Sequence, residues 1–178
     1  MVYTHHYASP LGGITLESDG GCLTGLRFDG QKDYTAASDA RSAEICLPVF
    51  DRSDRWLDLY FSGQEPDFTP PLRLKTTAFR KAVWEILLSV PYGQTITYGE
   101  IARRIEEKTG AARMSARAVG GAVGHNPIAL IIPCHRVVGS DGSLTGYAWG
   151  IQRKMKLLQL EQADMSRLFL RQKDTARR

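Results

Sequence analysis

One stretch in the second half of the chain, from Ile128 to Val138, constrains the fold more than any other. Its sequence is Ile-Ala-Leu-Ile-Ile-Pro-Cys-His-Arg-Val-Val. An apolar run of this length and composition must be buried, and it predicts a buried strand. Pro133 has no N–H and biases Ile132 towards an extended conformation, so we expect the chain to enter Cys134 without helical character.

The end of this run carries a possible nucleophile. A lone cysteine is usually a small buried hydrophobe. Cys134, however, is followed at once by His135, and an imidazole beside a thiol can help to form the reactive thiolate. A cysteine in this role needs a lowered thiol pKa, because only the thiolate attacks, and we expect such a pKa for Cys134. This pair alone fits proteases, oxidoreductases and transferases equally well.

Length and composition bound the class of protein. The 178 residues suffice for one large domain or two small ones, and 43% hydrophobic and 24% charged residues are ordinary for a soluble globular protein. The first residues lack the regions of a secretory signal, and no apolar run approaches the roughly 20 residues needed to span a bilayer. We expect a cytoplasmic protein without a membrane partner.

The cysteines and histidines do not predict a metal site. Cys22, Cys46 and Cys134 are an odd, widely spaced set without a CxxC pair. This spacing argues against a disulfide framework and against a cysteine-rich zinc site. No ligand spacing supports a site built from His5, His6 and Cys22, so we expect no metal.

Three prolines between Gln64 and Pro71 mark a linker, so we expect two domains. These are an N-terminal α/β supporting domain at 1–75 and a second domain at 76–163, followed by a basic tail at 164–178. Within the first domain, we predict strands at 2–8, 12–17 and 22–28, a loop or short helix at 29–45 and a helix at 47–61.

Charge is divided unevenly between the halves. Residues 1–75 hold 7 Lys and Arg against 11 Asp and Glu, whereas residues 76–178 hold 16 against 8. The cysteine lies in the basic half, which favours a polyanionic partner, although a solvated basic surface would look the same.

The second domain reads as four helices with a hairpin between the last two. The expected elements are helices at 77–90, 97–107, 115–123 and 151–161, a turn at 108–114 and a tight hairpin around Asp141-Gly142. The helix at 115–123 is built from Ala and Gly with Arg117 near its start. Interior glycines weaken a helix, so small side chains here indicate a close approach, either to DNA or to another helix.

At this point the residues resemble one family. Pro133-Cys-His-Arg-Val137 is similar to the active-site motif of the O6-alkylguanine-DNA alkyltransferases, also called methylated-DNA–protein-cysteine methyltransferases. Further matching stretches stand in the family's order: Ala116-Arg-Ala-Val-Gly-Gly-Ala122, Asn126-Pro127, Gly146-Tyr147 and Leu157-Leu158 with Glu161. The resemblance is close over residues 77–161 and looser over the first domain.

The resemblance implies a fold and an activity. The fold is a two-domain α/β protein with a small ribonuclease H-like module and a mainly helical domain carrying a winged-helix-like helix–turn–helix. The activity is DNA repair: irreversible transfer of an alkyl group, chiefly methyl, from O6-alkylguanine and also O4-alkylthymine to Cys134, once per molecule. The partner is double-stranded DNA, bound through the minor groove by a monomer that flips the damaged nucleotide without a cofactor.

The resemblance also implies roles for individual residues. Cys134 is the acceptor, His135 the base acting through a water, and Glu161 the group that orients the imidazole. The remaining catalytic positions are Asn126, which braces the turn, and Tyr98, which hydrogen-bonds the flipped base. The DNA-binding positions are Arg117, which fills the vacated stack, with Ser115, Ala116 and Val123. The substrate pocket is formed by Val137, Tyr147, Ala148 and Trp149.

The sequence departs from the family pattern in two places, and two alternative functions remain open. The connection from Glu106 to Met114 is longer than usual, and Trp149 stands where many members have glycine. A non-catalytic lesion binder would keep the DNA-binding helix but lack the nucleophile, which Cys134 argues against. A helix–turn–helix regulator would use Cys134 only for structure or sensing.

Overall fold

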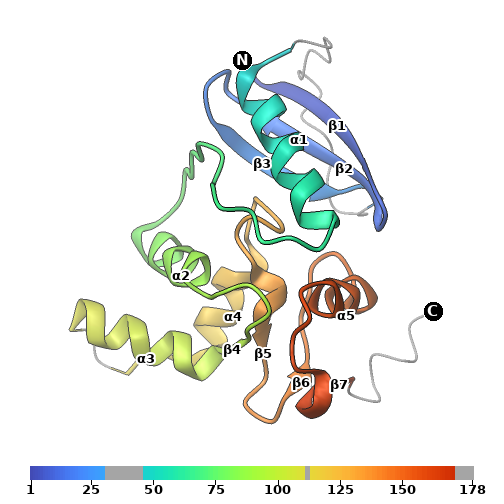
Figure 1. Cartoon of the computed structure of the whole chain (residues 1–178). Coiled ribbons are helices and arrows are strands. Elements are labelled where there is room, and N and C mark those ends of the chain that lie inside the picture. The colour runs from blue at the N-terminus through green and yellow to red at the C-terminus, as the bar shows by residue number, and fades with distance from the viewer. Residues whose placement is uncertain (31–45, 111–112, 171–178) are drawn as a thin grey trace. The chain divides into compact units, whose positions relative to one another are not determined.

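The computed structural model describes residues 1–30, 46–110 and 113–170 (Figure 1). The chain forms two compact units. The first comprises Met1–Lys75 together with Pro127–Ile131, and the second comprises Thr76–Asn126 together with Ile132–Arg178. This is a two-domain α/β protein.

The first unit is a three-stranded antiparallel sheet covered on one face by a helix (Figure 1). The strands are β1 (Tyr3–Ser9), β2 (Gly12–Ser18) and β3 (Leu23–Phe28), and the helix is α1 (Pro48–Phe61). Ile14 and Leu16 alternate with half-buried residues along β2 and are fully buried, as expected for a sheet with one covered face. The strands and helix predicted here are confirmed to within two residues, whereas most of 29–45 lies outside the described residues.

A short segment from the middle of the chain completes the first unit. Ile128 forms a parallel bridge to Leu26 of β3, where the Leu26 N–H donates to the Pro127 carbonyl at 2.9 Å and the Ala129 N–H donates to the Leu26 carbonyl at 2.8 Å. The predicted boundary at residue 75 did not assign this segment to the first unit. A proline-rich linker marks where the chain leaves a domain, but it does not show that a later segment packs against that domain again.

The second unit is mainly helical. Its helices are α2 (Ala78–Leu88), α3 (Tyr98–Thr109), α4 (Ala116–Gly124) and α5 (Ile151–Leu160). Thr77, Thr97 and Ser115 cap the first three of these helices, each side chain accepting from the backbone N–H three residues on. All four helices are confirmed close to their predicted bounds. The expected turn after α3 begins with Gly110 in a left-handed conformation, and residues 111–112 lie outside the described part.

The prediction of a strand over Ile128–Val138 is wrong for most of its length. Residues 129–132 form turns and bends, with Leu130 at a positive φ of 66°, and Cys134–Arg136 form a 3₁₀ turn, η1. Only Val137–Val138 are extended, as β5, which pairs in parallel with β4 (Ile96–Thr97). An apolar run shows that a segment is buried, but it does not separate a buried strand from buried turns.

The predicted hairpin and tail also differ from the structure. Gly142 turns the chain at φ 86°, and the Gly139 N–H donates to the Ser143 carbonyl. However, β6 (Ser143–Leu144) pairs in parallel with β7 (Phe169–Leu170) and not with β5. The first part of the basic tail is therefore ordered in the 3₁₀ turn η2 (Met165–Arg167) and in β7.

Candidate active site

Cys134 opens η1 in the interior of the second unit. Its side chain and backbone together are only 3% exposed, and Pro133 precedes the turn. The Asn126 amide reaches over from the end of α4 and donates to the Ile132 carbonyl at 2.8 Å and to the Cys134 Sγ at 3.2 Å. One side chain therefore holds both the loop and the sulfur.

The pKa of the Cys134 thiol is raised and not, as expected, lowered. Burial raises the pKa of the Cys134 thiol to about 11, against opposing contributions from the Asn126 hydrogen bond and the charge of Lys154. The expectation of a lowered pKa is therefore wrong for the unliganded protein, because the desolvation of a buried thiolate outweighs the polar groups around it. At neutral pH this cysteine is a thiol, and a base must remove its proton.

The neighbouring histidine is paired with a carboxylate. His135 Nε2 lies 2.6 Å from Glu161 Oε1, and both side chains are fully buried. Burial lowers the pKa of His135 in spite of the opposing carboxylate, so the imidazole is neutral at neutral pH. Burial alone would raise the pKa of Glu161, but His135 and Arg136 together hold it well below its usual range. A neutral imidazole held by an ionised carboxylate has the right form for a base.

Two residues that sequence reasoning missed complete the surroundings of Glu161. Arg136 donates from Nε to Glu161 Oε2 at 2.8 Å and from Nη2 to Oε1 at 3.1 Å, and its Nη1 donates to the Val90 carbonyl at 2.5 Å. The Gly93 N–H donates to Glu161 Oε2 at 3.1 Å. The basic residue inside the Cys-His-Arg motif was the one available signal; nothing in the sequence connects Gly93 with Glu161.

Tyr98 reaches the same region from another element. Because β4 pairs with β5, the first residue of α3 lies close to the chain that leaves η1. The Tyr98 hydroxyl donates to the Thr145 carbonyl at 3.5 Å, and burial raises its pKa. The phenol therefore stays protonated and can donate a hydrogen bond over the whole neutral range.

The four predicted pocket residues are not alike. Val137, Tyr147 and Trp149 are buried, whereas Ala148 between them is exposed. Tyr147 and Trp149 meet edge to face, with ring centroids 5.3 Å apart. Within the described residues, neither the Tyr147 hydroxyl nor the Trp149 indole N–H has a hydrogen-bond partner.

The predicted DNA-binding residues differ in exposure. Val123 is only 3% exposed and lies in the core. The exposed predicted residues of α4 and its cap are Ser115, Ala116 and Arg117. Gly121, four residues after Arg117, lies beside it on the exposed face of α4, and Ala118 is also exposed. The small side chains of α4 also allow close packing within the second unit. The Trp84 indole N–H reaches the Ala122 carbonyl and donates to it at 2.9 Å.

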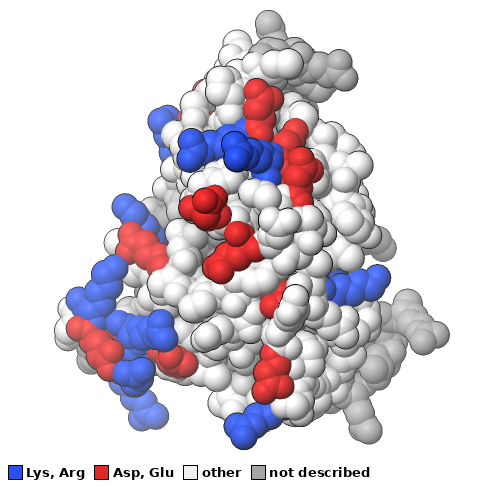
Figure 2. All heavy atoms as spheres, viewed as in Figure 1, with Lys and Arg blue, Asp and Glu red and all other residues white. Residues whose placement is uncertain are grey.

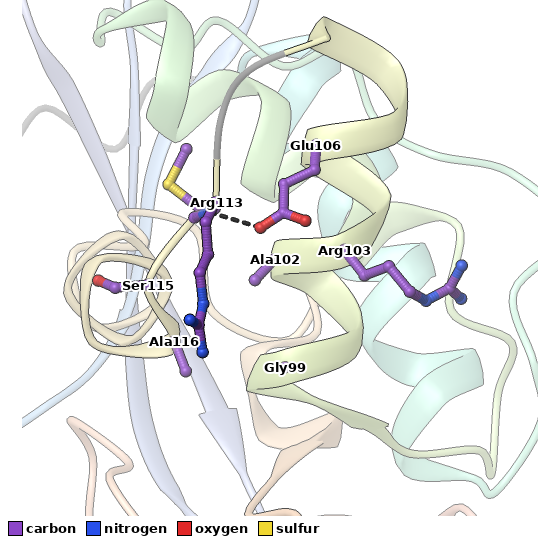
Figure 3. Close-up of a pocket in the computed structure, with 8 residues that line it drawn as sticks. Gly99, Ala102, Arg103, Glu106, Arg113, Ser115 and Ala116 are labelled. Atoms are coloured by element: carbon purple, nitrogen blue, oxygen red, sulfur yellow. Dashed lines mark hydrogen bonds between the residues drawn. The ribbon is translucent and has the colours of Figure 1, made fainter.

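A hollow of about 670 Å³ lies where α3 meets the start of α4 (Figure 3). Arg113 extends along it towards Ala116, whereas Arg103 points away from Arg113 (Figure 3). The Glu106 carboxylate accepts from the Met114 N–H and thereby fixes the end of the connection that precedes α4. The hollow is lined by Gly99, Ala102, Arg103, Glu106, Arg113, Met114, Ser115 and Ala116.

Several basic residues of the second unit are ion-paired or buried, so its net charge overstates the charge that is available to bind an anion. Figure 2 shows Lys and Arg mixed with Asp and Glu over the region of α3. Three basic residues there form ion pairs: Arg103 with Glu107, Arg104 with Glu100, and Lys108 with Glu85. Arg136 and Lys154 are buried. Arg113 and Arg117 lie beside the start of α4, are exposed, and take part in none of the ion pairs found within the described residues.

The histidines of β1 have other partners. His5 Nε2 lies 2.8 Å from Asp54, and His6 Nε2 lies 2.7 Å from Asp29. Neighbouring residues of a strand point to opposite faces, so these two imidazoles do not converge with Cys22 on one ion. Within residues 1–30, 46–110 and 113–170, no cluster of three or more metal-ligating side chains is found. None of the helices described there is both long and apolar enough to cross a membrane.

Comparison with known proteins identifies both units. Residues 78–163 match the family model described as the DNA-binding domain of 6-O-methylguanine DNA methyltransferase, and residues 2–74 match the model described as its ribonuclease-like domain. Together the two models cover most of the chain.

Individual relatives agree with the family models. The chain is 43% identical to the methylated-DNA–protein-cysteine methyltransferase of Mycobacterium tuberculosis, covering 92% of this chain and 94% of the relative. It is 41% identical to that of Haemophilus influenzae, covering 90% and 86%. Among solved structures, Mycobacterium tuberculosis OGT in complex with DNA superposes with a TM-score of 0.79 at 42% identity, covering 90% of this chain and 94% of that one.

Proposed function

The chain belongs to the 6-O-methylguanine DNA methyltransferase family, and we propose that it repairs DNA by moving an alkyl group, chiefly methyl, from O6 of guanine onto the sulfur of Cys134. The observation that carries this proposal is the buried arrangement of Cys134, held by Asn126, beside the His135–Glu161 pair at 2.6 Å. It supplies a sulfur, a neutral imidazole and an orienting carboxylate in one unit.

The reaction follows from the chemistry of these groups. His135 takes the thiol proton through a water, and the sulfur then attacks the alkyl carbon in line with the C–O6 bond. The S–C bond forms as the C–O6 bond breaks, and the electron pair leaves with guanine. The guanine anion, hydrogen-bonded by Tyr98, takes up a proton from water, and His135 returns the thiol proton to water. Since Nε2 of His135 is engaged by Glu161, Nδ1 is the atom that acts as base.

The product is a thioether, which does not revert, so each molecule acts once and no cofactor takes part. The raised pKa of the Cys134 thiol fits this scheme, because a thiol without a bound lesion stays protonated and inert. In the bound state the neutral His135 provides the route for the proton.

For DNA binding we propose that α3 and α4 form a winged-helix-like helix–turn–helix, beside a ribonuclease H-like first unit. The exposed face of α4 would enter the minor groove, with Arg117 filling the place of the flipped nucleotide. The small side chains of Ala118 and Gly121 support this orientation because they allow close approach. The protein would act as a cytoplasmic monomer on duplexes with O6-alkylguanine and, in addition, O4-alkylthymine.

The decisive experiment uses a duplex that contains O6-methylguanine. We expect incubation to add one methyl group to the peptide that contains Cys134, measured by peptide mass. Cys134→Ser should abolish transfer and keep most of the lesion binding. Binding without an adduct in the wild-type protein would favour a non-catalytic lesion binder, and equal affinity for damaged and undamaged duplexes would favour a regulator.

We further propose that Trp149 narrows the alkyl pocket and favours methyl over bulkier groups. Its ring is buried against Tyr147, and two buried polar groups without described partners at this place are typical of a site that receives a ligand. Trp149→Gly should therefore raise the rate with O6-benzylguanine relative to that with O6-methylguanine. An unchanged ratio of the two rates would exclude this role.

A further inference from the structure

The connection between α3 and α4, which is longer than the family pattern, has no part in the reaction described above. The structure describes both of its ends. Gly110 ends α3 in a left-handed conformation, and at the other end the Met114 N–H donates to the Glu106 carboxylate. Because Glu106 belongs to α3, the connection is tied back to that helix immediately before α4 begins.

This tie places Arg113 at the hollow between α3 and the start of α4. Figure 3 shows its side chain extending along the hollow towards Ala116. Arg113 is exposed, and it has no hydrogen bond or ion pair with any residue that the structure describes. A guanidinium held in this way, without a carboxylate partner, is available to bind an anion.

The other charged residues that line the hollow are already engaged. Arg103 points away from Arg113 (Figure 3) and pairs with Glu107 at 2.5 Å. Glu106 accepts from the Met114 N–H. Among the charged residues of this lining, Arg113 is therefore the one whose charge no partner matches within the described part of the chain.

The remaining lining residues leave room for a phosphate group. Four of them are small: Gly99, Ala102, Ser115 and Ala116. The Ser115 hydroxyl oxygen accepts from the Ala118 N–H at 3.1 Å, and its own proton has no acceptor among the described residues. Arginine and serine side chains are common donors to the phosphate oxygens of DNA, and small neighbours allow the backbone to come close.

We propose that this connection is an arm that binds the DNA backbone: Arg113 and Ser115 hold one phosphate of the duplex beside the groove that α4 enters, and Glu106 positions the arm. This inference rests on the proposed function, because it takes α4 as the helix that meets DNA. A backbone contact carries no information about the base, so it contributes equally to damaged and undamaged duplexes. Arg117 differs, since it fills the stack only after a nucleotide has been flipped.

The test is the affinity for an undamaged duplex and for an O6-methylguanine duplex, both measured in the unreactive Cys134→Ser background from about 50 mM to about 200 mM salt. Loss of one phosphate contact lowers the slope of log affinity against log salt by about 0.9. Over this fourfold range, the affinity of Arg113→Gln should therefore fall about 3.5-fold less than that of the parent protein, with either duplex. At the lowest salt concentration the variant should bind more weakly than its parent.

Arg103→Gln is the matched control. It removes the same charge from a residue that lines the same hollow, but one whose guanidinium is paired and points away. Its slope should equal that of the parent protein. A slope that changes equally in both variants would show an effect of net charge and would overturn the inference.

Glu106→Ala tests the positioning role. Removal of a negative charge would by itself strengthen binding to DNA, whereas loss of the tie to the Met114 N–H should weaken it. We expect weaker binding, and Glu106→Gln, whose amide oxygen can still accept, should bind more tightly than Glu106→Ala. Tighter binding by Glu106→Ala than by the parent protein would overturn this role.

The outcomes separate this inference from the proposed function. If the wild-type protein forms no adduct on Cys134, the proposed function fails. If the adduct forms and Arg113→Gln keeps the parent slope, or changes it only with the damaged duplex, the inference alone fails. Transfer from the free base O6-benzylguanine, which has no phosphate, should be the same with and without Arg113→Gln; slower transfer would mean that residue 113 supports the reaction site and would overturn the inference.

Discussion

At the scale of single residues, Glu161 shows how many functions one buried carboxylate can combine. It accepts from His135, from two nitrogens of Arg136 and from the Gly93 N–H. Hydrogen bonds to a carboxylate from charged donors are stronger than those between neutral groups, and a buried carboxylate that loses its partners is costly. The stability of this unit and, in the proposed reaction, the orientation of His135 therefore depend on the same side chain.

This dependence predicts how stability changes with pH. The pKa of Glu161 is lower in the folded than in the unfolded protein, so its contribution is present above its ordinary value of 4.5 and is lost as the pH falls through the folded value. His135 acts in the same direction, since its lowered pKa makes folding less favourable as the pH falls below 6.5. We expect the free energy of unfolding, measured with urea, to fall from pH 7 to pH 4.

Glu161→Gln separates the contribution of this carboxylate to the pH dependence of stability from those of the other titratable groups. The variant should be less stable at pH 7 by several kcal/mol, because Arg136 keeps a buried charge without its partner. It should also lose less stability between pH 5 and pH 4 than the wild-type protein. A variant whose stability falls as steeply as that of the wild type in this interval would show that other carboxylates dominate acid unfolding.

At the scale of elements, the turn between α2 and β4 is shaped by the site. Gly93 has a φ of 73°, and a Cβ at this position would lie 2.6 Å from the Glu161 carbonyl oxygen. Both the backbone conformation and the space therefore require glycine.

Gly93→Ala should destabilise the protein by more than about 1 kcal/mol and slow the transfer, since Glu161 must move. Gly99→Ala is the matched control, because a Cβ there would lie 4.0 Å from its nearest neighbour and the residue has an ordinary helical conformation. Gly93→Ala should have the lower unfolding temperature and the slower transfer. Equal effects of the two substitutions would contradict the close approach of residue 93 to the Glu161 carbonyl.

The elements also show what could be predicted from this sequence. The helices were predictable because Thr77, Thr97 and Ser115 combine a capping side chain with an apolar stripe, and both signals are local. The geometry around Cys134 was not, because Ile128–Pro133 satisfies its backbone through Leu26, Asn126 and short turns that depend on distant residues. The burial of Lys154 and Arg136 was not predicted for the same reason: the sequence does not show that a charged residue is buried when its partners are distant in the chain.

At the scale of the whole molecule, the two units are not independent pieces of chain. Pro127–Ile131 belongs to the first unit, and Ile128 and Leu130 are almost completely buried there. A fragment of residues 76–178 would expose these apolar side chains and would lose the hydrogen bonds to Leu26. The segment that leads to Cys134 would then keep the Asn126 hydrogen bond to the Ile132 carbonyl but lose its hydrogen bonds to β3.

We therefore expect the fragment 76–178 to unfold at a lower temperature than the full chain and to transfer methyl groups more slowly. Addition of the separate fragment 1–75 should restore part of the rate, because the hydrogen bonds to β3 can form between two chains. A fragment that equals the full chain in both measurements would show that the first unit contributes nothing to the site.

The position of Glu161 along the chain has a consequence for biosynthesis. His135 and Arg136 leave the ribosome well before the carboxylate that binds them, and α5 lies between. Until that helix has been made, the nascent chain contains the thiol but not the carboxylate that binds His135 and Arg136. We therefore expect a chain that stops before residue 161 to lack the partner of His135 and, under the proposed mechanism, to transfer the methyl group poorly.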